Sequence, residues 1–379
     1  MNIAIFGGSF NPVHNGHINL VKAAKTALKL DKVIIMPTFV TPKKVGRLGI
    51  TTYARSELCR KAFEGIAEVS DYEMNKGGVS YSYETCEHFK KQYPNDKLYF
   101  LMGADSYSTF PDWKLPLRIL DCVTLAVCDR GDKENLERAD KNFKKKFHFG
   151  IGSGVEKFEC SRVDVSSTRI RTLAAFGEWV GEYVPENAAD YILDNNLYAL
   201  PDLDKVEDCI NNGKRYGHTL RVAIMAAENC TRFGVDEITA VKAAAFHDCA
   251  KYLKEGDNKL KGFVCPEGVP APVVHQYSGA YVAKNYFNIQ DENILDAIRF
   301  HASGKEDMSP LAKLLYLCDM LEEGRTFDGV ERLREIFYED IDKCLLACLE
   351  HQLKYLKKSG EEIYPLTRQA YNFYKEILK

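Results

Sequence analysis

The pattern of apolar residues changes character about half-way along the chain, and this change limits the fold more than any other feature. Before residue 187, short apolar runs at residues 2–6, 32–37, 97–103 and 123–127 alternate with stretches of helical period. Strands that alternate with helices predict βαβ units and a parallel sheet. Beyond that point, long Ala/Leu/Ile patterns of helical period take over. We therefore predict a doubly wound α/β domain followed by an all-α domain.

The boundary between the two domains is predicted near residue 200. Residues 195–202 carry turn-forming side chains and a proline. With 379 residues, the chain is long enough for two domains of ordinary size. We predict domains at residues 1–199 and 200–379. Within the second domain, the amphipathic stretch at residues 330–356 is predicted to be one helix that covers the core.

The overall composition disfavours several classes of partner. Lys and Arg number 51 against 54 Asp and Glu, so the formal net charge is -3, and the basic field of a nonspecific nucleic-acid binder is missing. No apolar run approaches the roughly 18 residues needed to span a bilayer, and the N-terminus lacks the basic start of a signal peptide. The 12 cysteines form no Cys-x-x-Cys pair, which predicts reduced, mostly buried thiols. We expect a cytoplasmic protein that binds neither nucleic acid nor membrane. Homo-oligomerisation is left open.

The first apolar run leads into a glycine-rich loop that suits phosphate groups. Gly8, Ser9 and Phe10 begin this loop, and His14 and His17 follow at the start of a helical pattern. Glycines let backbone N–H groups approach anionic oxygens, and a helix N-terminus carries partial positive charge. Imidazoles three residues apart lie on one helix face, where they can donate hydrogen bonds. This order of strand, loop and helix predicts a triphosphate site rather than a glycine turn with two incidental histidines.

A second polar cluster lies at residues 165–171. Within the run Ser166-Ser167-Thr168, two hydroxyl side chains come before a predicted helix start, and Arg169 and Arg171 follow. Hydroxyls at this position are typical of an ordinary helix N-cap. The arginines would add charge-assisted contacts to phosphate oxygens if they converge on the same ligand. Taken alone, this cluster does not decide between the two interpretations.

Together, the two segments resemble the two signatures of the nucleotidylyltransferase superfamily, which has a Rossmann-like fold. Their spacing resembles that of bacterial nicotinate-nucleotide adenylyltransferases over about residues 1–198. Further similarities are Thr51-Thr52 with Arg55, and Gly103-Ala104-Asp105 with Trp113. The resemblance implies transfer of AMP from ATP, with Mg²⁺, to nicotinate mononucleotide, giving the dinucleotide and pyrophosphate. Such a transfer needs mainly positioning and charge stabilisation rather than a covalent nucleophile.

The resemblance also implies roles for individual residues. His14 and His17 would hold the ATP phosphates and stabilise the departing pyrophosphate, with Arg171 and Ser167 on the β/γ side. Thr85 and Trp113 would line the pocket for nicotinate mononucleotide, where the indole would stack on the pyridine ring. Asp105 would face the ATP ribose, and Lys44 would steady the phosphates from a loop. The remaining ATP-binding residues would be Gly8, Ser9, Phe10, Ser166 and Thr168.

The chain departs from the usual family pattern at two places. Thr41-Pro42-Lys43-Lys44 replaces a Pro-Pro-His-Lys segment, and Ser80-Tyr81-Ser82-Tyr83-Glu84-Thr85 replaces Ser-Tyr-Thr-x-Asp-Thr. Both changes lie in segments that would contact the acceptor. Another phosphorylated acceptor such as phosphopantetheine therefore stays open as an alternative, although Trp113 and the Thr85 region argue against it. The choice between nicotinate and nicotinamide mononucleotide is also left open.

The second half concentrates residues that suit a metal centre. Four of the nine histidines fall within residues 218–301, and one of them belongs to an adjacent His-Asp pair predicted on an alanine-rich helix. An unpaired Asp would be costly to bury there, which disfavours a purely structural role. Imidazole and carboxylate are ligands of first-row metals, and a two-metal site uses about six protein ligands. The candidate ligands are His218, His247, Asp248, His275, His301 and Asp319.

This order of residues resembles the HD phosphohydrolase superfamily, and the added His275 and His301 resemble its dinuclear members. The closest similarity is to the bacterial HD family that splits diadenosine tetraphosphate into two ADP, over about residues 203–345. The resemblance implies that Asp248 bridges two cations, which activate a water for attack on a phosphate. Lys251, counted with the catalytic residues, and Arg325 would clamp phosphates. Iron or manganese fits the His-rich ligand set best.

Two other functions stay open for the second half. It could be a nucleotide sensor that binds metal and ligand and regulates the first half without hydrolysis. It could also act on a guanosine alarmone. HD enzymes of that kind typically need only the four-ligand core, so the added His275 and His301 argue against this function. Our leading hypothesis is one chain with two active sites, one making a dinucleotide and one hydrolysing dinucleoside polyphosphates.

Overall fold

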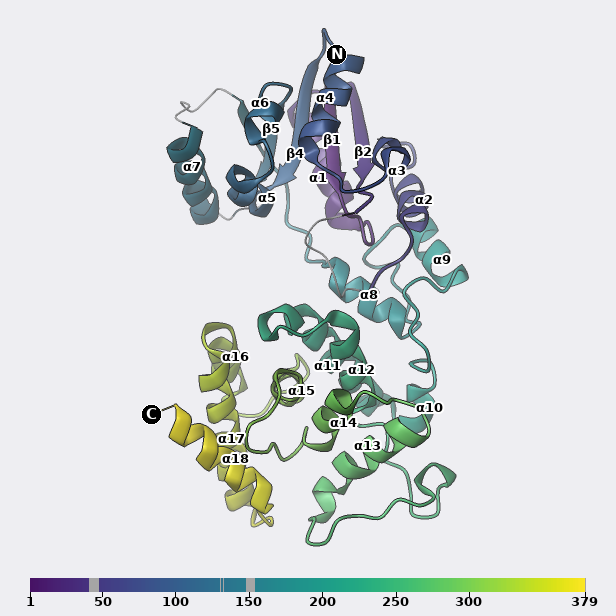
Figure 1. Cartoon of the computed structure of the whole chain (residues 1–379), viewed down its shortest axis with the longest axis vertical. Coiled ribbons are helices and arrows are strands. Elements are labelled where there is room, and N and C mark those ends of the chain that lie inside the picture. The colour runs from purple at the N-terminus through teal and green to yellow at the C-terminus, as the bar shows by residue number, and fades with distance from the viewer. Residues whose placement is uncertain (41–47, 130, 132, 148–153, 379) are drawn as a thin grey trace. The chain divides into compact units, whose positions relative to one another are not determined.

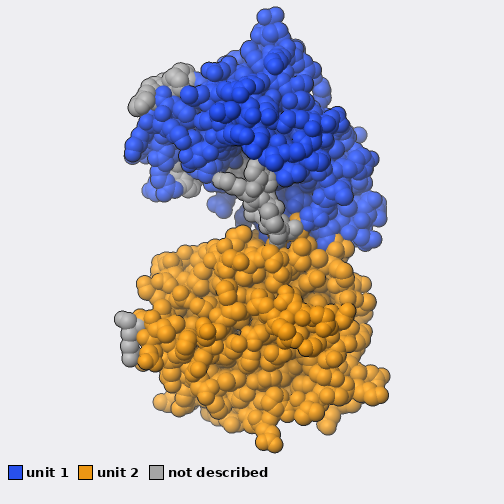
Figure 2. Space-filling view, in the orientation of Figure 1, with its two compact units in different colours: residues 1–44, 49–174, 179–198 blue, residues 45–48, 175–178, 199–379 orange. Residues whose placement is uncertain are grey.

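The computed structural model describes residues 1–40, 48–129, 131, 133–147 and 154–378. Their contacts divide the chain into two compact units, which we treat one at a time (Figure 2). Unit 1 contains the N-terminal segment with residues 49–174 and 179–198, and unit 2 contains residues 175–178 and those from 199 onward. Whether residues 1–199 and 200–379 fold as independent domains stays a prediction.

Unit 1 alternates strands and helices, as the apolar pattern predicts (Figure 1). Its elements are β1 (Asn2–Gly8), α1 (Asn15–Ala27), β2 (Lys32–Pro37), α2 (Thr52–Ala62), β3 (Glu68–Val69), α3 (Tyr72–Lys76), α4 (Ser82–Gln92), β4 (Lys97–Gly103), α5 (Ala104–Thr109), η1 (Phe110–Asp112), α6 (Pro116–Leu120), β5 (Thr124–Asp129), α7 (Lys133–Phe147), β6 (Val155–Glu159), α8 (Ser167–Ala175) and α9 (Glu186–Asp194).

The six strands form one parallel sheet in the order β3-β2-β1-β4-β5-β6. Ile3 and Ile5 of β1, with Phe100 of β4, lie on one face, where they pack against buried residues of α4 and α7. Helices α1 and α2 contact sheet strands as well, and their apolar side chains, such as Val21 and Leu58, are buried. A parallel sheet buried in this way explains its near-continuous apolar strands. The predicted doubly wound α/β fold is confirmed.

Unit 2 contains only helices among the residues that the structure describes. They are α10 (Val206–Ile210), α11 (Gly213–Asn229), η2 (Cys230–Phe233), α12 (Glu237–Phe246), η3 (Asn258–Leu260), η4 (Ala271–Val273), α13 (Val274–Asn285), α14 (Glu292–Arg299), α15 (Pro310–Leu321), α16 (Val330–Glu339), α17 (Ile341–Ser359) and α18 (Pro365–Ile377). Helix α11 packs against α12 and α15, and α14 packs against α13 and α15. The all-α prediction is confirmed.

Two local predictions are wrong. The stretch predicted as one helix at residues 330–356 is two helices, because Asp340 leaves the helical conformation and its side chain accepts a hydrogen bond from the Lys343 amide, which caps α17. His247 and Asp248 do not lie within a helix: α12 ends at Phe246, and the pair follows directly. Both residues remain fully buried.

Two predictions from composition concern the cysteines and the membrane. All 12 cysteines are free thiols and nine of them are buried, in agreement with the expectation of reduced, mostly buried thiols. Within the described part of the chain, every helix is either too short or too polar to cross a bilayer.

Candidate active sites

The loop after β1 lies at the point where the sheet changes direction. Strand β1 has β2 on one side and β4 on the other. Chain connections diverge at such a position, and ligands of doubly wound sheets bind at the carboxyl ends of the strands there. Gly8 ends β1, and a Cβ at this residue would meet the Phe10 ring at 3.1 Å. The close approach explains the glycine.

The two histidines of this loop contact each other. His14 precedes α1 directly, and its backbone N–H donates to Nδ1 of His17 at 3.1 Å. The ring centroids lie 3.7 Å apart. Because Nδ1 of a neutral His17 accepts this bond, its proton is on Nε2, which is then a donor suited to a phosphate oxygen. The buried ring of Phe10 packs edge-on against His17 at 5.1 Å.

The second polar cluster contacts the first loop. Arg171 is 2% exposed, and its guanidinium donates to the Asn11 carbonyl at 2.6 Å and to Thr168 Oγ1 at 3.0 Å. Ser167 Oγ donates to the Pro12 carbonyl at 3.2 Å. The structure thus brings the two signatures together within unit 1. A direct role of Arg171, Ser167 and Thr168 toward ATP stays a prediction.

Ser166 acts as a helix N-cap, which is the structural interpretation of this cluster. Its hydroxyl accepts a hydrogen bond from the Arg169 amide at 3.1 Å, so it caps the start of α8. Capping and ligand binding are compatible, because a hydroxyl has a second lone pair and a proton to donate.

Arg55 is a residue whose contacts the sequence did not reveal. It lies on α2 and is 7% exposed. Its guanidinium donates to the Ser9 carbonyl at 2.6 Å and to the carbonyls of Thr38 and Phe39 at 2.6 and 3.1 Å. Burial lowers the pKa of Arg55. One buried cation therefore joins the loops that follow β1 and β2 and fixes them relative to each other.

The residues predicted for the acceptor side occupy different environments. Trp113 packs edge-on against Phe100 and lies 5.4 Å from the ring of Phe110, so part of the indole belongs to the core. Asp105 is exposed at the start of α5, directly after β4. Lys44 lies outside the described residues. The ligand roles of these three residues stay predictions.

Thr85 is buried, and its hydroxyl donates to Glu73 Oε1 at 2.6 Å. Glu73 on α3 is 6% exposed, and burial raises its pKa above the ordinary value. Its other oxygen, Oε2, has no hydrogen-bond partner among the described residues. Glu73 is not recognisable from the sequence, since an acidic residue in a short helix carries no local signal of burial.

In unit 2, the six predicted metal ligands converge from five parts of the chain. His218 lies on α11, His247 and Asp248 follow α12, and His275 lies on α13. His301 follows α14 and Asp319 lies on α15.

The donor atoms form two groups. In the first, ligand atoms of His218, His247 and Asp319 all lie within 4.8 Å of one another. The second contains His247, Asp248 and His301 within the same limit. His275 adjoins the second group, because its Nε2 lies 3.2 Å from Nε2 of His301 and 3.4 Å from Asp248 Oδ1. The structure therefore brings all six predicted residues together, and His247 is the residue that the two groups share.

Ring orientation directs the imidazole nitrogens toward this cluster. Nδ1 of His247 lies 2.6 Å from the Ala244 carbonyl, and Nδ1 of His301 lies 2.7 Å from the Ile298 carbonyl. A carbonyl can only accept, so both rings carry a proton on Nδ1, and a neutral ring then presents the lone pair of Nε2 to the cluster. Fixed tautomers of this kind are typical of metal-binding histidines.

The pKa values show what the cluster stabilises. Burial raises the pKa of Asp248, but His247 and His301 outweigh burial and hold it well below its usual range. For Asp319, burial is likewise outweighed, by His218 and Arg325. Burial, assisted by His301, lowers the pKa of His275 to about 3, so this ring is neutral at physiological pH. Ionised carboxylates and neutral imidazole are the protonation states that bind cations.

Three cationic side chains lie at the edge of the cluster. Arg215 on α11 contacts Asp248 Oδ2 at 2.8 Å, a contact that the sequence does not reveal. Lys251 Nζ lies 3.5 Å from Asp248 Oδ1. Arg325 donates to the carboxylate of Asp319 at 2.7 Å, so the side chain predicted to clamp phosphate also holds a predicted ligand. The phosphate contacts of Lys251 and Arg325 stay predictions.

The residues present fit a pair of divalent cations. Nε2 of His247 and Oδ1 of Asp248 are buried and form no hydrogen bond among the described residues. Leaving such atoms without a partner is costly, and a cation removes that cost. The set of imidazole and carboxylate donors suits first-row metals.

Glu322 is a further missed residue behind the cluster. It is 2% exposed, and its carboxylate lies 3.0 Å from Nδ1 of His218. The same carboxylate accepts from Arg221 Nε and from the Gly324 amide, each at 2.5 Å. It therefore holds His218 with Nε2 toward Asp319. Its position directly after α15, near a predicted ligand, was the available signal.

Comparisons with known proteins agree with these two sites. The cytidylyltransferase-like family matches residues 5–173, and the HD domain matches residues 215–324. A "probable nicotinate-nucleotide adenylyltransferase/Ap4A hydrolase" of Mycoplasma genitalium is 30% identical over 330 residues, covering 85% of this chain and 88% of that protein. A protein of the same name from Mycoplasma pneumoniae is 28% identical and covers 86% of this chain and 89% of its own length.

Other relatives match one half of the chain. A "probable nicotinate-nucleotide adenylyltransferase" of Clostridium botulinum, strain Kyoto, is 34% identical over 201 residues, which are 52% of this chain and 99% of that protein. A crystal structure described as a predicted HD superfamily hydrolase involved in NAD metabolism, from Clostridium acetobutylicum, is 33% identical with a TM-score of 0.43, and covers 46% of this chain and 97% of that one. From the similarity over 85% of its length and the two domain matches, the chain belongs to the nicotinate-nucleotide adenylyltransferase/Ap4A hydrolase family.

Proposed function

We propose that this chain is a bifunctional enzyme. Unit 1 transfers AMP from ATP to nicotinate mononucleotide and releases pyrophosphate, and unit 2 hydrolyses dinucleoside polyphosphates such as diadenosine tetraphosphate to two ADP. Relatives named for both activities match across both halves. The observation that carries the proposal is the convergence of two separate polar sites, the His14/His17 loop and the six-residue histidine and aspartate cluster.

In unit 1, the transfer needs positioned donors around the phosphates. The Nε2–H of His17 and the backbone of the loop after β1 would donate to the phosphate oxygens of ATP. Arg55 and Arg171 hold that loop through its carbonyls, so the donors keep their places as charge moves onto the departing pyrophosphate. Preorganised donors of this kind need no covalent intermediate.

In unit 2, His218, His247, Asp248, His275, His301 and Asp319 would hold the cations. Bound divalent cations supply charge that lowers the pKa of water and stabilises the phosphoryl oxygens. The chain itself orients this set: Glu322 fixes His218, and Arg215 and Arg325 hold the two aspartates. Lys251, at the edge of the cluster, would neutralise charge on the leaving phosphate.

The finer assignments belong to the same proposal. We propose Mg²⁺ with ATP in unit 1, and two iron or manganese ions in unit 2, since imidazole-rich sites suit these metals. A cytoplasmic location is consistent with the 12 free cysteines, because reducing compartments keep thiols free. The proposed partners are small nucleotides, without nucleic acid, membrane or an assigned oligomeric state.

The test uses reciprocal variants of the full chain. Asp248→Ala removes a buried ligand of unit 2, and His17→Ala removes the donor of unit 1. We expect the first variant to lose diadenosine tetraphosphate hydrolysis and keep dinucleotide synthesis, and the second to do the opposite. Ser359→Ala, at an exposed position of α17, is the control and should keep both activities.

Each result against the proposal is specific. Wild type that releases no pyrophosphate with ATP and nicotinate mononucleotide would refute the activity of unit 1. Pyrophosphate release from ATP with phosphopantetheine, but not with nicotinate mononucleotide, would make phosphopantetheine the acceptor. Wild type that never cleaves the tetraphosphate, combined with altered synthesis in Asp248→Ala, would make unit 2 a sensor instead.

A further inference from the structure

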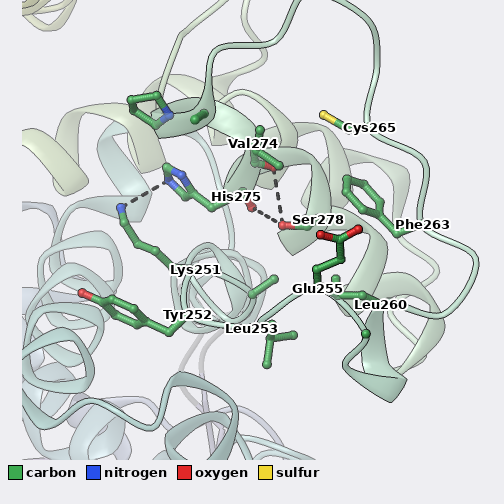
Figure 3. Close-up of a pocket in the computed structure, with 14 residues that line it drawn as sticks. Lys251, Tyr252, Leu253, Glu255, Leu260, Phe263, Cys265, Val274, His275 and Ser278 are labelled. Atoms are coloured by element: carbon green, nitrogen blue, oxygen red, sulfur yellow. Dashed lines mark hydrogen bonds between the residues drawn. The ribbon is translucent and has the colours of Figure 1, made fainter.

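A cavity of about 660 Å³ lies in unit 2 beside the histidine and aspartate cluster (Figure 3). Its volume is in the range of pockets that bind small organic ligands. The walls come from the segment after α12, from η3 and the residues that follow it, and from the start of α13. The proposed function assigns no role to this cavity.

One side of the cavity carries the amine of Lys251 and borders the cluster. Lys251 and His275 line it, and Figure 3 shows the amine of Lys251 directed toward the imidazole of His275. Their nitrogens lie 3.3 Å apart. Both also lie near Asp248 Oδ1, Lys251 at 3.5 Å and His275 at 3.4 Å. A phosphate chain that leaves the cavity past Lys251 therefore reaches the cluster directly.

The rest of the lining is mostly apolar, with hydrogen-bond acceptors. Leu253, Leu260, Phe263 and Val274 supply apolar surface. The Ser278 hydroxyl, also in the lining, donates to carbonyls within α13, so its oxygen still has acceptor capacity for a ligand. The exposed carboxylate of Glu255 and the hydroxyl of Tyr252 complete the set. Acceptors on an apolar wall suit the N–H and O–H groups of a nucleoside.

The wall that carries Phe263 is anchored to the protein. The Phe263 amide donates to the Leu260 carbonyl at 2.9 Å, and the Tyr281 hydroxyl of α13 donates to the Lys261 carbonyl at 2.6 Å. The rings of Phe263 and Tyr281 lie 5.5 Å apart. The aromatic face is thus positioned before any ligand binds, which lowers the entropic cost of binding.

We propose that this cavity binds one nucleoside of the substrate, with the base against Phe263 and the phosphates leaving past Lys251 and His275. The inference rests on the proposed function of unit 2 and names the part of the substrate that the cavity recognises. The ligand class is a nucleoside 5′-polyphosphate. A phosphate chain without a nucleoside would leave the apolar wall unused.

The experiment separates the nucleoside from the phosphates. The full chain is loaded with Mn²⁺, and hydrolysis of p-nitrophenyl phosphate reports on the cluster, which Asp248→Ala verifies by losing this activity. Inhibition constants are measured for ADP and for inorganic pyrophosphate, which share a diphosphate and differ by the nucleoside. Phe263→Ala removes the aromatic face, and Val274→Trp fills the cavity. Val264→Ala is the matched control, because Val264 is 83% exposed and does not line the cavity.

We expect both cavity variants to raise the inhibition constant of ADP by about tenfold, the size of a lost base–aromatic contact, while that of pyrophosphate stays at the wild-type value. The control should match wild type for both inhibitors. Unchanged ADP inhibition in both variants would overturn the inference, and so would an equal increase for ADP and pyrophosphate. Cleavage of diadenosine tetraphosphate by wild type is scored separately. If it is absent while ADP inhibition depends on the cavity, the proposed function fails and the nucleoside site stands.

Discussion

The buried carboxylate of Glu322 allows a sharp prediction about metal binding. In wild type, this carboxylate accepts from Arg221 and Gly324 and lies 3.0 Å from Nδ1 of His218. Burial raises its pKa, but His218 and Arg221 outweigh burial and lower it to about 2, so the group is ionised at physiological pH. Nδ1 of His218 donates to this carboxylate, so that Nε2, directed toward Asp319, can offer its lone pair when a cation is bound.

Glu322→Gln keeps the shape and reverses this arrangement. The amide oxygen replaces one carboxylate oxygen, and the –NH₂ group must replace the other. If –NH₂ faces His218, it donates to Nδ1 and moves the proton of the ring to Nε2, where it opposes a cation. If –NH₂ faces Arg221 and Gly324, it is a donor placed against two other donors, the Arg221 guanidinium and the Gly324 amide. One charge-assisted hydrogen bond is lost in either case, at a cost of about 1.5–3 kcal/mol, or roughly 10- to 150-fold in affinity.

The assay is calorimetric titration of Mn²⁺ into chelator-treated full chain. We expect Glu322→Gln to bind about 10- to 100-fold more weakly than wild type, as for other partners of metal-bound histidines. Glu306→Gln removes the same charge from an exposed position of unit 2 and should bind like wild type. Dinucleotide synthesis by unit 1 should be unchanged in both. Wild-type Mn²⁺ affinity in Glu322→Gln would refute the reasoning that this carboxylate fixes His218.

Three other predictions address packing, metal removal and pH. A Cβ at Gly279 on α13 would lie 3.0 Å from the His247 carbonyl oxygen, so Gly279→Ala should lower the free energy of unfolding in urea by about 1–3 kcal/mol. The control Gly213→Ala has open space around the added Cβ and should not show this loss. Equal losses in the two variants would contradict the tight packing at Gly279. Mn²⁺ at 100 times its dissociation constant should stabilise unit 2 by about 2.7 kcal/mol. Calorimetry should show this as an unfolding temperature that falls when the metal is removed with a chelator. In Asp248→Ala the unfolding temperature should not change on chelation. Because burial raises the pKa of Glu73 above 4.5, the folded state binds this proton more tightly than the unfolded chain. Glu73 therefore contributes fully to the free energy of unfolding below that pH, and this contribution is lost as the pH rises through the folded pKa. The free energies of unfolding of wild type and Glu73→Gln in urea should diverge over this pH window. Free energies that follow the same pH dependence in both proteins would exclude the effect.

The edges of the sheet show why part of the fold was missed. The four central strands have apolar runs, because a parallel strand buried on both faces needs them, and those runs were visible in the sequence. Strands β3 and β6 lie at the two edges. β3 has only two residues, and three of the five residues of β6 are charged, so neither forms an apolar run.

The residues of the candidate sites also divide into those that the sequence reveals and those that it does not. Histidines and aspartates were recognisable because their chemistry is carried by residue type and their order resembles known motifs. Glu73, Arg215 and Glu322 were not, since acidic and basic residues are usually exposed and only burial against a partner distinguishes them.

The amino-acid sequence by itself determined the two fold classes, the order of the motifs and the chemical nature of the donors. These properties depend on local periodicity and on residue type, which folding does not alter. Only the tertiary structure decided that atoms of His218, His247 and Asp319 come within 4.8 Å of one another, and that a cavity borders the cluster at His275. Such distances depend on how α11, α13 and α15 pack, and that packing is set by side-chain contacts between segments far apart along the chain.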